Sequence, residues 1–223
     1  MKKTFTILNA VLIAATLISS ICYYQFGGIE RKGLTAFGFV LVGAVNLIYA
    51  IKSKVGNLRF PLLMAMGLLF SMIGDVVLNL SFIPGALIFA VGHIFYFAAY
   101  CNLMEFKARD LILSILIFAV SAMIITLVPI FDFGSALMEG ICMLYALVIS
   151  FMVGKACSNL LRKRNAVTAI AVVGSVLFYF SDLMLVFNVF ADASKITDTL
   201  CLFSYFPAQC LLAHSIFQFS KNK

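Results

Sequence analysis

Long apolar segments separated by short polar stretches fill almost the whole chain. Each segment has about the 20 residues that an α-helix needs to cross a hydrocarbon core ~30 Å thick. The pattern predicts eight such helices, at residues 4–24, 34–51, 60–80, 84–104, 111–130, 133–153, 166–190 and 198–219. Because the polar stretches are too short for a soluble domain, we expect residues 1–223 to form one all-α domain, a polytopic membrane bundle of about eight transmembrane helices.

The composition agrees with an integral membrane protein. Hydrophobic residues make up 64% of the 223 residues and charged residues only 11%, against roughly 25% charged residues in soluble domains. The first apolar segment follows Lys2 and Lys3, as in a signal peptide, but its apolar run is long and Ile21, not a small residue, precedes Cys22. A cleavage site or lipid-attachment site requires a small residue there, so we expect this segment to remain as the first helix.

The distribution of Lys and Arg predicts the orientation of the bundle. One side carries 13 of these 16 residues, on both termini and on the loops 52–59, 105–110 and 155–165, whereas the other side carries only Arg31, Lys32 and Lys195. The positive-inside rule therefore places both termini in the cytoplasm, with the bundle in an inner (cytoplasmic) membrane of the bacterial type. Since topology explains the net charge of +7, and no basic face with interleaved aromatics occurs, nucleic acid is not an expected partner.

A short pattern occurs in both the third and the seventh predicted helix. Asp75 and Asp182 each follow a small residue and precede an asparagine, and the next helix in each case carries two polar side chains. The residues are Gly74, Asn79, His93 and Tyr96 in the first case and Ser181, Asn188, Tyr205 and Gln209 in the second. The pattern is consistent with two four-helix halves related by a pseudo-axis along the membrane normal.

Three of the nine acidic residues lie well inside predicted helices: Asp75, Glu139 and Asp182. An ionisable group in hydrocarbon is costly, so it usually faces a protein interior or a wet cavity and has a function. The alternative for a single intramembrane aspartate is a structural role, as a hydrogen-bond contact between helices. With the predicted topology, however, all three acidic residues lie in the non-cytoplasmic half of the bilayer. His93, Tyr96, Tyr205 and Gln209 come from the neighbouring helices, and Asn79 shares the helical stripe of Asp75. We therefore expect one shared polar cavity.

Several kinds of site are not indicated. The chain has no GxSxG, P-loop or HExxH motif, and its six cysteines form no CxxC pair, so neither a disulfide framework nor a cysteine zinc site is expected. The ceramidase type of membrane hydrolase uses several histidines around zinc, but only His93 and His214 occur here, at different depths. We expect no metal and no cofactor, and acid–base chemistry by carboxylates.

Five short motifs resemble, in order, those of the YhhN family of lysoplasmalogenases. They run from the third predicted helix to the eighth and comprise Gly74-Asp75 with Leu78, Phe89-x-x-Gly92-His93-x-x-Tyr96, Tyr145 with Met152, Phe178-x-x-Ser181-Asp182 and Tyr205-x-x-Ala208-Gln209. The last motif departs from the family pattern, because Phe206-Pro207 stands where a second aromatic and a variable residue are more usual. The motif therefore supports a role for Gln209 more directly than one for Tyr205.

The resemblance implies a hydrolase that cleaves the vinyl ether bond of a lysoplasmalogen, giving a fatty aldehyde and glycerophosphoethanolamine or glycerophosphocholine. Lysophospholipid and membrane lipid are then the expected partners. Together with the cavity argument, the resemblance indicates Asp75 and Asp182 as catalytic residues. Substrate contacts are expected from His93, Tyr96, Glu139, Tyr145, Tyr205, Gln209 and Asn79.

This chemistry requires a proton on the alkene carbon and then water on the adjacent carbon, which two carboxylates can divide as they do in sugar hydrolysis. Apolar neighbours favour Asp75 as the proton donor, and Tyr205 and Gln209, expected opposite Asp182, favour Asp182 as the ionised partner. Two other classes remain open: a small transporter that uses the aspartates as a proton or ion relay, and a lipid-binding receptor without turnover.

Overall fold

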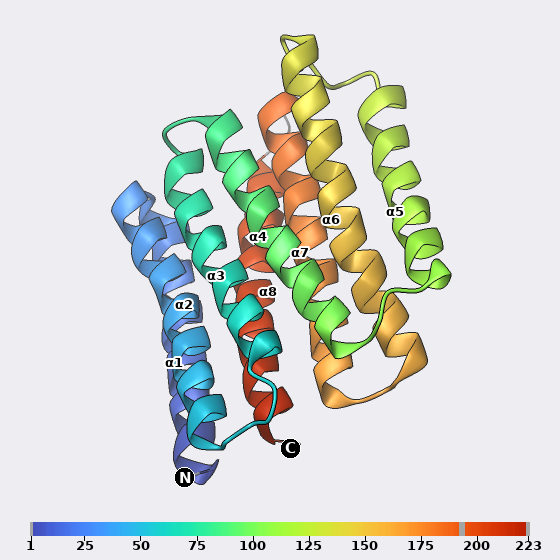
Figure 1. Ribbon diagram of the computed structural model, residues 1–223. Helices are drawn as coiled ribbons and strands as arrows, with labels where there is room; N and C mark the ends of the chain where they lie inside the picture. Colours follow the sequence, from blue (N-terminus) through green and yellow to red (C-terminus); the bar gives the residue numbers. More distant parts are fainter. Residues whose placement is uncertain (1, 192–194, 222–223) are drawn as a thin grey trace.

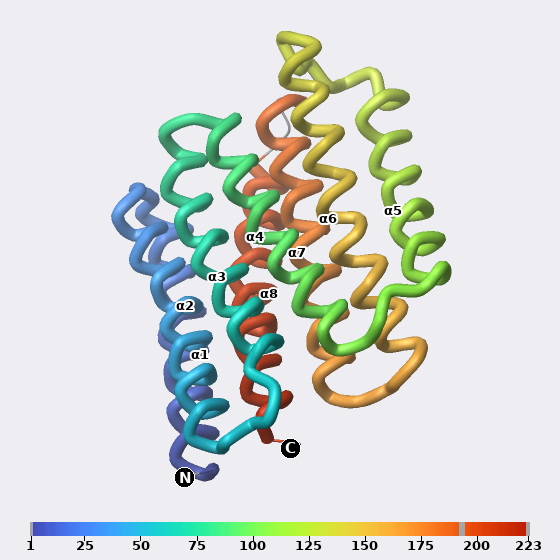
Figure 2. The backbone as a smooth tube through the Cα atoms, in the orientation of Figure 1, coloured from blue at the N-terminus to red at the C-terminus, as the bar shows by residue number. Residues whose placement is uncertain are grey.

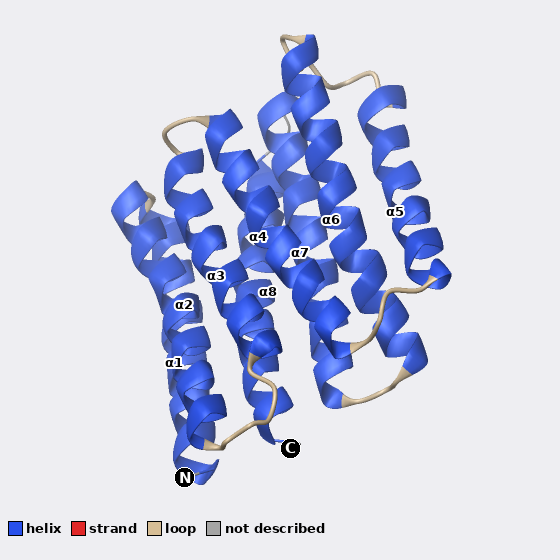
Figure 3. Ribbon diagram, viewed as in Figure 1, coloured by secondary structure: helices blue, strands red, loops and turns tan. Residues whose placement is uncertain are grey.

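The protein is described here by a computed structural model, which covers residues 2–191 and 195–221 and in which these residues form eight α-helices joined by short loops (Figures 1 and 3). The helices are α1 (Lys2–Phe26), α2 (Ile29–Lys52), α3 (Arg59–Leu78), α4 (Phe82–Leu103), α5 (Ala108–Leu127), α6 (Ala136–Arg162), α7 (Ala166–Phe190) and α8 (Lys195–Lys221). All eight are long and apolar enough to cross a membrane. The prediction of an all-α, eight-helix membrane bundle is confirmed.

Two helix boundaries differ from the predicted ones in a way that matters. Helix α2 begins at Ile29 rather than at residue 34, so that Lys32 is a helical residue and not part of a loop. Helix α6 continues to Arg162 and takes in most of the predicted loop 155–165. The prediction that Lys155 lies in this loop was wrong, because its side chain is fully buried in the bundle.

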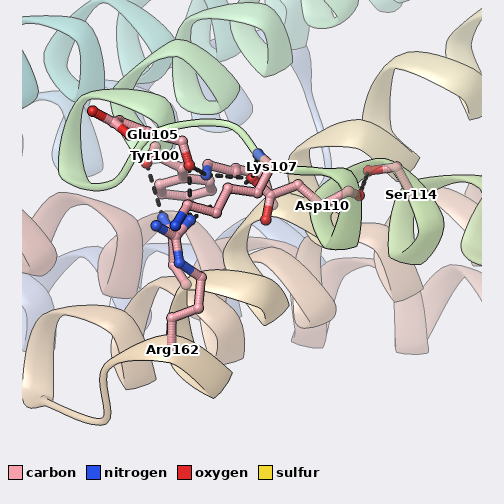
Figure 4. Close-up of polar contacts among 8 residues, drawn as sticks. Tyr100, Glu105, Lys107, Asp110, Ser114 and Arg162 are labelled. Carbon is pink, nitrogen blue, oxygen red and sulfur yellow. Dashed lines mark hydrogen bonds and ion pairs between the residues drawn. The ribbon is translucent and has the colours of Figure 1, made fainter.

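Buried ionic contacts explain how α6 carries a lysine inside the protein. The ammonium group of Lys155 lies 2.6 Å from Oδ2 of Asp110, which is also fully buried, and donates to the carbonyl of Glu105. Arg162 donates to the same carbonyl, and Asp110 accepts from the backbone N–H of Lys107 (Figure 4). A buried charge is tolerated only when it is paired and hydrogen-bonded. The partners lie about 50 residues away in the chain, so charge alone wrongly indicated a loop.

Most helix contacts among the described residues repeat between the two halves of the chain, and those of α8 with α1 and α3 do not. In the first half α1 packs on α2, α2 on α3 and α3 on α4, and in the second half α5 packs on α6, α6 on α7 and α7 on α8. Between the halves, α4 packs on α6 and α8 packs on α2, which is the same relation seen from each half. Helices α1 and α5 lie at opposite edges of the bundle (Figure 2). Helix α8 is the most enclosed of the eight, since 67% of the residues in its most apolar stretch are buried.

Glycines let α3 and α4 approach closely and so position the end of α3. A Cβ atom built on Gly67 would lie 2.4 Å from the ring of Tyr96, and one built on Gly85 would lie 2.5 Å from the backbone Cα of Leu78. Both separations are shorter than non-bonded carbon atoms allow. The close contact therefore depends on the absence of a side chain at these positions.

We expect the Gly85→Ala substitution to lower the melting temperature of the detergent-solubilised protein by several degrees, because the added methyl meets backbone and overpacking destabilises by about 1–3 kcal/mol. Gly140→Ala in α6 is the matched control, since nothing lies within 4 Å of a Cβ built there. Alanine is the better helix former, so Gly140→Ala should leave the melting temperature unchanged or raise it. An equal effect of both substitutions would contradict the close-packing argument.

Helix α1 begins and α8 ends at the same end of the bundle (Figure 1), as an even number of helices requires. We expect this end to face the cytoplasm because most of the Lys and Arg residues lie there. A phosphatase reporter that is active only outside the cytoplasm should be active when fused after Gly28 and inactive when fused after Lys163. The same result at both positions would contradict this topology.

Candidate functional site

A pocket opens among six helices near the end of the bundle opposite the termini. It encloses about 690 Å³ of empty space, including its open mouth, and its walls are mainly apolar. Among the described residues that line it, three have charged side chains: Lys32 of α2, Asp75 of α3 and Asp182 of α7. The two aspartates that the sequence singled out therefore face the same pocket.

Asp75 lies in the last turn of α3, and its two carboxylate oxygens have different partners. The hydroxyl of Tyr205 donates to Oδ2 at 2.6 Å, and the ammonium group of Lys32 lies 3.5 Å from Oδ1. Only 3% of the Asp75 side chain is exposed. A cation and a phenol donor both stabilise the ionised form of a carboxylate.

Asp182 is surrounded by a phenol and an imidazole. The hydroxyl of Tyr145 donates to Oδ2 of Asp182 at 2.7 Å, and Nε2 of His93 lies 2.7 Å from the Tyr145 hydroxyl and 3.4 Å from the same Oδ2. Nδ1 of His93 is buried and has no hydrogen-bond partner in the described part of the chain. Since a bare acceptor is tolerated better than a bare N–H group, we assign the ring proton to Nε2, which then donates toward Tyr145.

The two aspartates have partners from equivalent helices. Each contacts one side chain from the preceding helix of its own half and one from the last helix of the other half: α2 and α8 for Asp75, α6 and α4 for Asp182. The chemistry differs at both positions: α2 contributes the cation of Lys32 where α6 contributes the phenol of Tyr145, and α8 contributes the phenol of Tyr205 where α4 contributes the imidazole of His93. The two carboxylates thus have equivalent positions in the fold but different electrostatic surroundings.

A buried aromatic ring and a second polar layer support the pocket. The ring centroid of Phe178, which is fully buried, lies 4.6 Å from that of His93 and 5.2 Å from that of Tyr205, so it packs against both clusters. Deeper in the bundle, the hydroxyl of Tyr96 donates to Oε1 of Gln209 at 2.9 Å. Both of these residues are fully buried and do not line the pocket.

A second, mainly apolar crevice lies between α5, α6 and α7, beside the pocket. The two cavities share four lining residues: Cys142, Tyr145, Asp182 and Val186. The Asp182 side chain, 13% exposed, therefore borders both the apolar crevice and the pocket with the charged residues.

The structure does not bring all of the predicted site residues to the pocket. Asp75, Asp182, Tyr145 and Tyr205 line it, and His93 does not line it but contacts Asp182. Glu139 lies half-buried in the first turn of α6 and is not among the lining residues.

Asn79 is exposed at the end of α3, where its side-chain amide donates to the backbone carbonyl of Asp75. It caps the helix end and does not line the pocket. Asn79 does lie one helical turn after Asp75, as predicted, but this turn is beyond the pocket.

The expectation that Tyr205 and Gln209 lie opposite Asp182 was wrong. Tyr205 binds Asp75, and Gln209 binds Tyr96, because α8 packs on α3 as well as on α7. Sequence reasoning also missed Lys32, which was counted as a loop charge. Lys32 lies in the first turn of α2, and α2 packs on α3. This position lets its side chain reach Asp75.

In the described part of the chain, no three His, Cys, Asp or Glu side chains come together in a way that would hold a metal ion. The second histidine, His214, is hydrogen-bonded to Gln218 in the last turns of α8, far along the helix from Tyr205. The two histidines thus belong to different surroundings.

Comparison with known proteins identifies the family. The YhhN family profile matches residues 35–216, a range that contains both aspartates and their partners except Lys32. No curated protein and no solved structure matches the chain. Because the family match covers most of the sequence, the chain belongs to the YhhN family.

Proposed function

We propose that this protein is a membrane-embedded lysoplasmalogenase that hydrolyses the vinyl ether bond of a lysoplasmalogen. The observation that carries the proposal is a pair of carboxylates, Asp75 and Asp182, lining one mainly apolar pocket in different hydrogen-bonding surroundings. Membership of the YhhN family, which is associated with hydrolase activity, supports it.

The surroundings of the carboxylates suggest how they divide the work. Asp75 has an ammonium group 3.5 Å away and accepts from a phenol, which suits a carboxylate that stays ionised. Asp182 has no cation among its described partners and borders the apolar crevice, which suits a proton donor. We therefore assign the acid role to Asp182, the reverse of the assignment from sequence, because Tyr205 and Lys32 both lie at Asp75.

The proposed reaction proceeds in three steps. Asp182 gives its proton to the alkene carbon that is not bonded to oxygen, and the adjacent carbon becomes an oxocarbenium ion. Asp75 stabilises this cation and orients a water molecule that adds to it, and the proton released from the water returns to Asp182. The resulting hemiacetal then breaks its C–O bond to the glycerol while its hydroxyl proton passes to the glycerol oxygen, giving the fatty aldehyde and a free glycerol hydroxyl.

The shape of the cavities suits an amphiphile with one hydrocarbon chain. Asp182 lines the apolar crevice as well as the pocket, so a chain can lie in the crevice with the vinyl ether beside the proton donor. The charged residues on the other side of Asp182 then face the polar part of the lipid. His93 and Tyr145 hold the Asp182 carboxyl in position through Nε2 and the phenol hydroxyl.

Purified protein incubated with an alkenyl-lysophospholipid should release a long-chain aldehyde. Asp182→Asn and Asp75→Asn preserve the shape of the side chain but remove its acid–base chemistry, so each should lower kcat by roughly 10²–10⁴-fold. Lipid binding should be largely retained. The readout is aldehyde formation, measured beside the melting temperature of each variant.

Glu30→Gln is the matched control, since Glu30 is an exposed carboxylate near the same end of the bundle and its loss should leave turnover unchanged. Absence of aldehyde with the unaltered protein, or near-normal turnover in a folded Asp182→Asn variant, would contradict the hydrolase proposal. The transporter or receptor function would then gain.

Turnover should also persist after chelation. A zinc site with three histidines requires more than the two that this chain has, and His93 and His214 have different surroundings. Dialysis against a chelator should therefore change aldehyde formation by less than about 2-fold, whereas loss of a general acid or base would lower it by roughly 10²–10⁴-fold. Loss of activity that zinc restores would contradict the carboxylate mechanism.

A further inference from the structure

Lys32 has the geometry of an anion-binding residue that is only partly used by the protein itself. Its ammonium group lies 3.5 Å from Asp75 Oδ1, longer than the ~2.7–2.9 Å of a tight charge-assisted hydrogen bond. The group has three N–H donors, and its side chain, 12% exposed, lines the pocket. A second anion can therefore approach Lys32 without displacing a tight contact.

A phosphate that enters the pocket finds one cation to pair with. Among the described lining residues, Lys32 is the one cation beside two carboxylates. A lysophospholipid brings a phosphodiester anion into this mainly apolar pocket, where an unpaired charge is costly. Pairing with the ammonium group of Lys32 would offset the cost of burying the phosphodiester charge.

We propose that Lys32 binds the phosphodiester of the substrate lipid and thereby selects phospholipids over neutral ether lipids. The assignment rests on the proposed function for its substrate. The family match begins at residue 35, so it says nothing about Lys32.

The order of the binding elements fits the order of groups in a lysoplasmalogen. Lys32 contacts Asp75, Asp75 shares the pocket with Asp182, and Asp182 borders the apolar crevice. A lipid lying along this line has its phosphate at Lys32, its vinyl ether between the two carboxylates and its chain in the crevice.

The position of Lys32 along its helix also fits a headgroup. Lys32 lies in the first turn of α2, at the end of the bundle opposite the termini. The phosphates of a bilayer lie at this interfacial level, outside the hydrocarbon core. The substrate is therefore drawn from the leaflet on the side opposite the chain termini.

The test is a comparison of two non-hydrolysable lipids. A 1-O-alkyl-lysophosphatidylcholine has the phosphodiester but no vinyl ether, and a 1-O-alkylglycerol with the same chain lacks the phosphate; equilibrium binding of both to the purified protein is measured. Lys32→Gln should weaken binding of the phospholipid about 10- to 100-fold, as the loss of a hydrogen-bonded charge does, and change binding of the alkylglycerol less than about 2-fold. Lys32→Arg should retain most of the affinity.

Arg31→Gln removes the neighbouring cation, which does not line the pocket, and should leave both affinities unchanged. If Lys32→Gln does not fold, because Asp75 loses its counter-charge, the double variant Lys32→Gln/Asp75→Asn is compared with Asp75→Asn and should give the same selective loss.

An equal loss for both lipids, or no loss for either, would overturn the proposal. Inorganic phosphate is the third probe, and binding of free phosphate that depends on Lys32 and is as tight as that of the phospholipid would overturn the assignment to a lipid. Since binding needs no turnover, a selective loss without aldehyde formation would leave the phosphate site in place while removing the hydrolase function.

Discussion

Compensation of buried charge is the constraint on which the bundle depends. A carboxylate inside a membrane protein must have hydrogen-bond donors or a cation nearby, because neither lipid nor apolar side chains can solvate it. Asp75 meets this requirement with Tyr205 and Lys32, and Asp182 meets it with Tyr145 and His93. These contacts join helices from both halves of the chain, so the same interactions that make the carboxylates tolerable also hold the halves together around the pocket.

A second buried ion pair differs from the carboxylates of the candidate site in its access to a cavity. Lys155 and Asp110 are in contact at 2.6 Å, and both side chains are fully enclosed by protein, where they fix the α4–α5 loop against α6. Asp182, in contrast, is partly exposed and lines two cavities. Burial of a charge alone is therefore a weak sign of function, and access from a cavity is what distinguishes the pocket.

The near-equivalence of the two halves makes the remaining difference informative. Equivalent helices surround Asp75 and Asp182, yet one carboxylate has a cation and the other has only neutral partners among the described residues. Two identical carboxylates would be poorly suited to a reaction that needs both a proton donor and an ionised base. In this fold a single residue from α2 provides that asymmetry.

The number of helices, their membrane character and the two aspartates of the candidate site could be predicted from the amino-acid sequence, because hydrophobic length and the rarity of intramembrane charge are local properties of the chain. The sequence did not determine the partners. Tyr205 was expected at Asp182 and binds Asp75, Lys155 was expected in a loop and is buried, and Lys32 was overlooked. Each of these outcomes depends on which helices pack side by side and how far a long side chain reaches between them, and only the tertiary structure decides that.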